Sequence, residues 1–133
     1  MEVVQNEVVL YGLDQHQGII DQIIQDMRIE ADAFDVKLIL VEAVTNAYLH
    51  GNLCDCKKPI SIRYILQDGQ LHLQVQDCGD GTEQIRIPET IDPLQLLEEG
   101  GRGLYLIRCC SDRAEMIRNT MFVSKRLKQP QPF

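Results

Sequence analysis

The sequence predicts a single domain of mixed α and β structure. Apolar residues at helical spacing mark three longer helices, and alternating apolar and polar residues mark strands on either side of them. The chain has 133 residues, which suits one domain and is enough to bury a hydrophobic core. We therefore expect one domain over residues 1–128, followed by a mobile tail at residues 129–133.

Composition excludes several classes of function. The 13 basic and 20 acidic residues give a net charge of −7, which disfavours nucleic acid and anionic membranes as partners. Tryptophan is absent, no apolar run approaches the roughly 20 residues of a spanning helix, and no signal peptide is evident. Cys54 and Cys56 could begin a metal site, but no second Cys or His pair completes four ligands. The five cysteines are therefore expected to be reduced thiols of a cytoplasmic protein.

The N-terminal part predicts one strand and one amphipathic helix. Residues 3–11 are rich in β-branched side chains and are expected to form an edge strand. Asp14, with Gln17 three positions later, resembles a capping box for a helix over residues 15–29. Apolar residues at helical spacing support this helix: Ile19, Ile20, Ile23, Ile24 and Met27.

A mostly apolar helix over residues 35–49 organises the chain. Two aspartates are candidates for its N-cap: Asp32 and Asp35. Glu42, Asn46 and His50 follow one another at intervals of four, which places them in a row on one face. These polar side chains would be costly in a dry core, so the row must face water, a polar partner or a ligand. A solvated stripe without chemistry is the alternative.

A hairpin should follow the loop at residues 52–59. Residues 60–66 and 71–77 alternate apolar and polar side chains, and the Asp68-Gly69 pair between them indicates a tight turn. Asp77 continues the apolar face of the second strand. A carboxylate on the core face needs a hydrogen-bond donor, which a bound ligand could supply.

Two glycine-rich segments come next. Gly79 and Gly81 let the backbone turn sharply and approach a ligand, although an ordinary turn would also explain them. Residues 82–99 form a long irregular segment that suits a lid, with a short helix expected at 93–98. Glycines at positions 100, 101 and 103 then open a helix over residues 104–110, an arrangement that can bind phosphate through free N–H groups.

The C-terminal part predicts a second hairpin. Residues 114–118 and 120–128 are expected to be strands joined at Asn119, which tolerates the left-handed conformation that such a turn can need. Cys109 and Cys110 lie on the preceding helix and are expected to be packing residues.

Three segments together resemble the GHKL (Bergerat-fold) ATPases, and in particular the bacterial anti-sigma-factor serine-protein kinases. The segments stand in the order of that superfamily's N, G1 and G2 boxes: residues 42–51, 77–81 and 100–107. The resemblance implies an α+β fold, a two-layer α/β sandwich with helices on one face of a mixed, mainly antiparallel sheet. It also implies ATP as ligand, with Mg²⁺.

The resemblance assigns roles to individual residues. Asn46 would offer its side-chain oxygen to Mg²⁺, which prefers oxygen ligands. Asp77 would accept a hydrogen bond from the adenine amino group, where guanine carries a carbonyl oxygen. Glu42 would orient or deprotonate the attacking nucleophile. The remaining nucleotide contacts would come from Gly79, Gly81, Gly101, Gly103 and Thr120.

Two positions depart from the family pattern, and the role of a third is open. Asn119 replaces the usual glycine before Thr120, and Thr82 replaces an apolar residue after Gly81. Arg102 is a candidate contact for phosphate or for a partner protein, and an exposed arginine without a specific role is the alternative.

The resemblance implies a kinase that phosphorylates a serine on an anti-sigma-factor antagonist and sequesters a sigma factor, as a homodimer. About forty residues precede Glu42, which leaves no room here for the two-helix phosphoacceptor domain of a sensor kinase. Two alternatives remain. One is a non-catalytic ATP-binding interaction module, which would not require Glu42. The other is a detached catalytic domain of a sensor histidine kinase.

Overall fold

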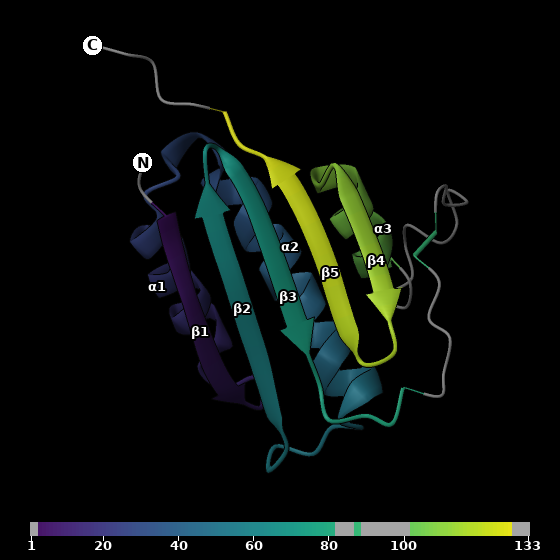
Figure 1. Ribbon diagram of the computed structural model, residues 1–133. Coiled ribbons are helices and arrows are strands. Elements are labelled where there is room, and N and C mark those ends of the chain that lie inside the picture. The colour runs from purple at the N-terminus through teal and green to yellow at the C-terminus, as the bar shows by residue number, and fades with distance from the viewer. Residues whose placement is uncertain (1–2, 82–86, 89–101, 129–133) are drawn as a thin grey trace.

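The computed structural model describes residues 3–81, 87–88 and 102–128, and it forms two layers (Figure 1). One layer is a five-stranded sheet in the order β1-β2-β3-β5-β4, and every strand pair in it is antiparallel. The strands are β1 (Val3–Tyr11), β2 (Pro59–Gln67), β3 (Gln70–Gln76), β4 (Arg113–Ile117) and β5 (Thr120–Arg126). The predicted α+β sandwich is confirmed, and the predicted strand at residues 3–11 lies at one edge of the sheet.

The second layer consists of helices that cover one face of the sheet (Figure 1). The helices are α1 (His16–Met27), α2 (Ala33–Asn46) and α3 (Arg102–Cys110), with a 3-10 turn η1 (Glu30–Asp32) before α2 and a π-helical turn η2 (Ala47–Gly51) directly after it. Helix α2 lies between the other two and packs against both. The helix predicted over residues 35–49 therefore begins earlier and ends in a different geometry.

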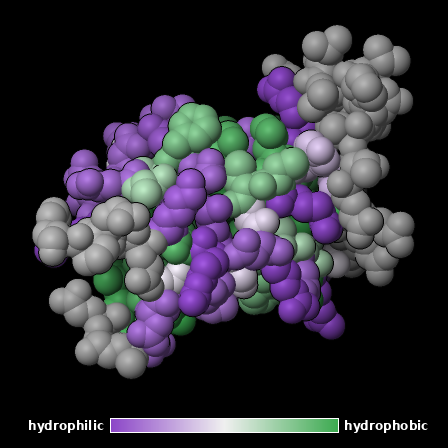
Figure 2. Space-filling model, turned by 90° about the horizontal axis from the view of Figure 1, so that it is seen from above, coloured by the Kyte–Doolittle hydropathy of each residue, from purple (hydrophilic) through white to green (hydrophobic). Residues whose placement is uncertain are grey.

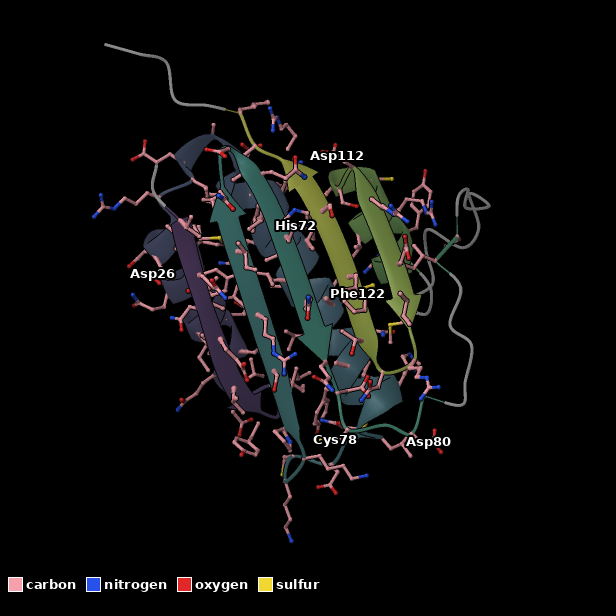
Figure 3. All side chains as sticks on the ribbon, viewed as in Figure 1. Asp26, His72, Cys78, Asp80, Asp112 and Phe122 are labelled. Atoms are coloured by element: carbon pink, nitrogen blue, oxygen red, sulfur yellow. The ribbon has the colours of Figure 1, made fainter. Side chains whose placement is uncertain are left out.

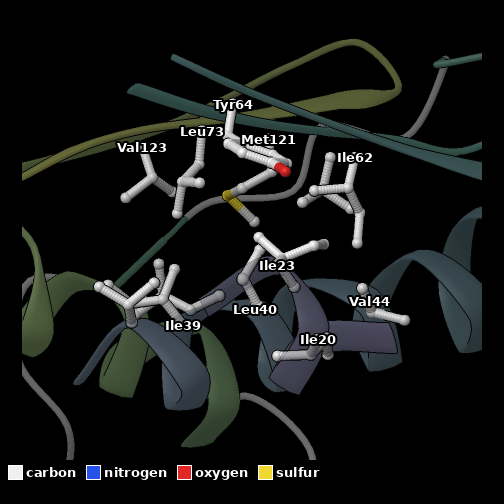
Figure 4. Packing of buried hydrophobic residues seen from close by; sticks show 14 of the residues in the cluster. Ile20, Ile23, Ile39, Leu40, Val44, Ile62, Tyr64, Leu73, Met121 and Val123 are labelled. Atoms are coloured by element: carbon white, nitrogen blue, oxygen red, sulfur yellow. The ribbon is translucent and has the colours of Figure 1, made fainter. Parts of the chain in front are cut away.

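The core lies between the two layers (Figure 4). Alternate side chains of each strand point toward the helices, which is why the period-two pattern of the sequence predicted the buried face. The fully buried side chains include Ile20, Ile23, Ile39, Leu40, Ile62, Leu73 and Ile107. Burial of each such side chain contributes about 1.5–3 kcal/mol relative to exposure. On the surface, hydrophilic side chains cover much of the end seen from above, and smaller hydrophobic areas lie between them (Figure 2).

The starts of α1 and α2 differ from the predicted caps. Gln15, not Asp14, occupies the N-cap position of α1 and makes no side-chain cap hydrogen bond, so the predicted capping box is wrong. Asp32 occupies the N-cap position of α2, but its Oδ2 accepts a hydrogen bond from the backbone N–H of Lys128 at 2.6 Å. A bond to a strand end across the fold has thus replaced the local cap.

Of the two hairpin turns, one matches the prediction and the other has a different left-handed residue. Asp68 and Gly69 both have positive φ, 54° and 76°, so the tight turn between β2 and β3 is confirmed. Between β4 and β5 the left-handed residue is Arg118, with φ 54°, and not Asn119 as predicted. Asn119 instead uses its side chain for a hydrogen bond, which is described below.

Some predicted features lie outside the described residues. These are the short helix at 93–98, all of the predicted lid except Ile87 and Pro88, Gly101, and the tail at 129–133. All five cysteines are described, and none forms a disulfide. Cys110 packs against the core, but Cys109 is exposed, so the predicted packing role of Cys109 is wrong. Within the described part of the chain, no helix is both long and apolar enough to cross a membrane.

Candidate functional site

Helix α2 carries two of the predicted site residues on its last turns. Glu42 and Asn46 are half-buried and lie one helical turn apart, as predicted. After Asn46 the helix widens into the π turn η2, in which the N–H of Asn52 bonds to the carbonyl of Ala47 at 2.8 Å. His50 lies in this wider turn and is exposed, so the predicted row is regular only as far as Asn46. Single π turns within helices occur frequently at functional sites.

Asp77 lies buried at the end of β3, where the alternation of the strand predicted it. Its side chain is only 5 % exposed, and its Oδ1 accepts a hydrogen bond from the N–H of Gly79 at 2.7 Å. Burial raises the pKa of the Asp77 carboxyl above its ordinary value of 3.8, and the Gly79 hydrogen bond offsets part of that increase. A buried carboxylate with this environment is a good acceptor for a polar ligand group.

The Gly51 backbone packs directly against the Asp77 carboxylate. A Cβ at Gly51 would overlap Oδ2 and Cγ of Asp77 and would lie 2.6 Å from the Asp77 Cβ. A Cβ at Gly79 would lie 2.9 Å from Asp77 Oδ1 and 3.0 Å from the Gly51 carbonyl oxygen. The backbones at positions 51 and 79 therefore approach the carboxylate from two sides. Gly51 was part of the motif that carried the resemblance, but sequence reasoning gave it no role.

Two asparagines hold the turn that follows β3. The N–H of Cys78 donates to Asn52 Oδ1 at 2.7 Å, and Asn119 Nδ2 donates to the carbonyl of Asp77 at 2.8 Å. Figure 3 shows Cys78 and Asp80 on this turn, at the end of the sheet where the β4–β5 hairpin turn also lies. Sequence reasoning missed Asn52; an amide directly after a helix-ending glycine was the available signal.

The β4–β5 turn packs closely against Gly81, the second glycine of the segment after β3. Gly81 has φ +73°, and a Cβ there would lie 3.1 Å from the Arg118 Cα. Thr120 begins β5, and its hydroxyl donates to Asn119 Oδ1 at 3.3 Å. The predicted residues Asp77, Gly79, Gly81 and Thr120 are thus brought together at one end of the sheet.

The other predicted residues lie where α3 begins. A Cβ at Gly103 would overlap Glu42 Oε2 and would lie 3.1 Å from its Cδ, so the Glu42 carboxylate rests against the first turn of α3. Arg102 is exposed at the start of this helix. Free N–H groups at a helix N-terminus favour an anion, and here a carboxylate already lies beside them.

The geometry suits a nucleoside triphosphate. Gly51 follows Glu42 by nine residues of one helix, which corresponds to about 13 Å along the axis. At the Gly51 end lies the buried carboxylate of Asp77 beside glycine backbones, and at the Glu42 end lies the N-terminus of α3. Among the described residues, no group of three or more His, Cys, Asp or Glu could hold a metal ion. Mg²⁺ would fit as an ion bound mainly by phosphate oxygens and water, with Asn46 as the nearby amide oxygen.

Comparisons with known proteins find related sequences. Residues 14–122 match the family model described as "Histidine kinase-like ATPase domain". The chain is 33% identical over 86 residues to an anti-sigma F factor of Clostridium perfringens, covering 62% of this chain and 60% of that protein. It is 38% identical over 77 residues to the anti-sigma F factor of Geobacillus stearothermophilus, covering 55% of this chain and 51% of that protein. It is 30% identical over 95 residues to the serine-protein kinase RsbW of Bacillus velezensis, covering 67% and 59%. The matched part therefore spans between half and about 60% of the length of these relatives.

Proposed function

The chain belongs to the histidine kinase-like ATPase domain family, and from that premise we propose that it is an ATP-dependent protein-serine kinase that acts as an anti-sigma factor. Its substrate would be a serine on an anti-sigma-factor antagonist, and its second partner would be a sigma factor. The names of the relatives support this proposal: two are anti-sigma F factors and one is a serine-protein kinase. A homodimer and a cytoplasmic location belong to the same proposal.

One observation carries the proposal for nucleotide binding. A single helix, α2, together with the turn that continues it, contacts both glycine-rich segments of the chain. It touches Asp77 through Gly51 and the start of α3 through Glu42 and Gly103. A ligand lying along this helix would therefore place its base and its phosphates on the two segments at once.

At the base end, Asp77 would select adenine. Its carboxylate accepts hydrogen bonds only, so it pairs with the exocyclic amino group of adenine and opposes the carbonyl of guanine. Gly51, Gly79 and Gly81 carry no side chain, so their backbones can lie close to Asp77 and to a base bound beside it. Thr120, at the start of β5, would contact the base from the side of the hairpin turn.

At the phosphate end, the backbone N–H groups of Gly101 and Gly103 would bind the phosphates, with Arg102 as an additional cationic contact. Asn46 would contribute an oxygen to Mg²⁺, which would screen the charge of the phosphates. Glu42 would accept the proton of the serine hydroxyl while the serine oxygen forms a bond to the γ-phosphorus of ATP. The bond between that phosphorus and the oxygen that bridges to the β-phosphate would break, and ADP would leave.

The test is a phosphotransfer assay with labelled ATP and candidate antagonist proteins. Glu42→Ala is expected to bind ATP as the parent does but to lose roughly 10²–10⁴-fold in rate, because a general base contributes on that order. Glu30→Ala, a change at an exposed glutamate in η1, is the matched control and should keep the parent rate.

The outcomes separate the candidate functions. Phosphorylation of a serine by the parent, lost in Glu42→Ala, supports the kinase. If the parent binds ATP and transfers phosphate to no antagonist, the non-catalytic interaction module takes its place. Transfer to a histidine of a separate protein would instead identify a detached sensor-kinase catalytic domain.

A further inference from the structure

We propose that Asn52 and Asn119 are positioning residues that hold the Asp77–Cys78 backbone from two sides and thereby set the base selectivity of the site. This inference rests on the proposed function, because it concerns how the same site distinguishes adenine from guanine. The two side chains come from different parts of the chain: Asn52 follows the π turn η2, and Asn119 lies in the β4–β5 hairpin turn.

Asn52 connects the turn to the loop before β2. It is fully buried, with 0% exposure, and its amide uses both of its sides. Nδ2 donates to the carbonyls of Lys58 and Pro59 at 3.1 Å and 3.3 Å, while Oδ1 accepts the N–H of Cys78 at 2.7 Å. A buried amide with these partners is satisfied, and removing it would leave the Cys78 N–H without this acceptor.

Asn119 binds Asp77 through two main-chain groups. Its Nδ2 donates to the Asp77 carbonyl at 2.8 Å, and its own carbonyl accepts the Asp77 N–H at 3.0 Å. The Asn119 side chain therefore adds one bond to a main-chain bond that any residue can make. Three successive polar groups, from the Asp77 N–H to the Cys78 N–H, are held by the two asparagines.

Fixing this backbone fixes the carboxylate. Asp77 has a short side chain, and the backbones of Gly51 and Gly79 close the space around it. Its direction is set by the Gly79 N–H bond to Oδ1 and by where its Cα lies. The place of the Cα depends on the hydrogen bonds of Asn52 and Asn119. If the backbone becomes less ordered, the carboxylate turns away from the base. The affinity for adenine nucleotides then falls and that for guanine nucleotides does not, because only adenine presents a hydrogen-bond donor at this point. A purely structural role would instead lower stability and leave the base preference unchanged.

The main experiment measures base preference by calorimetry with ADP and GDP, which the protein cannot consume by phosphotransfer. Asn119→Ala is expected to weaken ADP binding by roughly 3- to 10-fold, the value of one net hydrogen bond, with little change for GDP. Asn52→Ala should act in the same direction. Asn6→Ala is the matched control, because the Asn6 side chain bonds to Glu7 N on the distant strand β1 and should leave the ratio unchanged.

A second readout needs no nucleotide. Hydrogen exchange at the Cys78 amide should be slow in the parent and in Asn6→Ala, and faster in Asn52→Ala, which removes its acceptor. Asn119→Gly provides a variant for the case that Asn52→Ala does not fold, since it removes the side chain and keeps the main-chain bond to Asp77.

The two proposals fail separately. If the parent binds neither nucleotide, the proposed function is wrong, whatever the exchange rates show. If the parent prefers ADP and the Asn119 variants keep the same ADP-to-GDP ratio while folded, the positioning role is wrong and the proposed function stands. A ratio that falls in the Asn119 variants, with a control that does not change, supports the positioning role.

Discussion

The most informative single substitution is Gly51→Ala, because it adds one methyl group where the backbone packs against the Asp77 carboxylate. The new Cβ would overlap Oδ2 and Cγ of Asp77 and would lie 2.6 Å from its Cβ. Rotation of the Asp77 side chain can move its oxygens but not its Cβ. Either η2, which contains Gly51, or the turn after β3 must therefore shift, and the carboxylate must leave its present position.

The size of the effect follows from what the shift disrupts. Overpacking of a well-packed site costs about 1–3 kcal/mol of stability, which lowers Tm by several degrees. A hydrogen bond to a charged group is worth about 1.5–3 kcal/mol, so losing the one between Asp77 and the base weakens ATP binding by roughly 10- to 150-fold. GTP binding should change much less, because Asp77 makes no such bond with guanine.

Gly18→Ala is the matched control for this experiment. Gly18 lies in α1, and a Cβ there would meet no atom within 4 Å, so alanine should stabilise the helix by about 0.5–1 kcal/mol. Thermal unfolding and calorimetry with ATP and GTP should be measured on both variants. If folded Gly51→Ala binds ATP with the same affinity as the parent, the assignment of Asp77 as the adenine contact is refuted.

Three further predictions follow from the same geometry. Asp77→Asn should raise the Tm of the nucleotide-free protein near pH 7. Burial raises the Asp77 pKa, so ionisation of this carboxyl costs stability above that pKa; the gain should therefore shrink as pH falls through the raised pKa and vanish below the ordinary value of 3.8. A gain that is equal at all pH values, measured by thermal unfolding, would show that ionisation is not the cause. Gly103→Ala should fold with an undiminished Tm, because the flexible end of the Glu42 side chain can move away from the new methyl group. Calorimetry should nevertheless show weaker ATP binding by this variant. An ATP affinity equal to that of the parent would exclude a phosphate site at this turn. Asn46→Ala should reduce the difference in ATP affinity between Mg²⁺ and EDTA buffers, and a difference of the parent size would mean that Asn46 does not bind the metal.

The sequence predicted the fold and the burial of Asp77 because both depend on simple periodicity. Leu71, Leu73 and Val75 alternate with polar residues, and a strand that continues for one more step places Asp77 on the same face. The helices were likewise found from their apolar spacing; the end of α3 at Cys110 was correct, and the other ends differed by one to three residues. Helix ends are less predictable because a capping side chain such as Asp32 can be used by a distant backbone group instead.

The features of the site that were missed depend on contacts between distant residues. A glycine at the end of a helix reads as an ordinary C-cap, and only the folded chain shows that Gly51 lies against Asp77. Asn52 and Asn119 are 67 positions apart, and no local pattern indicates that both bond to one turn. The π turn was also missed, because five residues cannot reveal a shift from i−4 to i−5 bonding.

The π turn η2 holds one residue more than an α-helical turn would between the same two bonded groups. The Asn52 N–H bonds to the Ala47 carbonyl five positions earlier, not four. Deleting one of residues 48–50 would turn this into an ordinary i−4 bond to the same carbonyl, so Gly51 and Asn52 would keep their places beside Asp77 and Cys78. Leu49 and His50 are exposed and suit such a deletion. Chimeras that exchange the loop before β2 should start after Asn52, so that its N–H keeps the bond to Ala47.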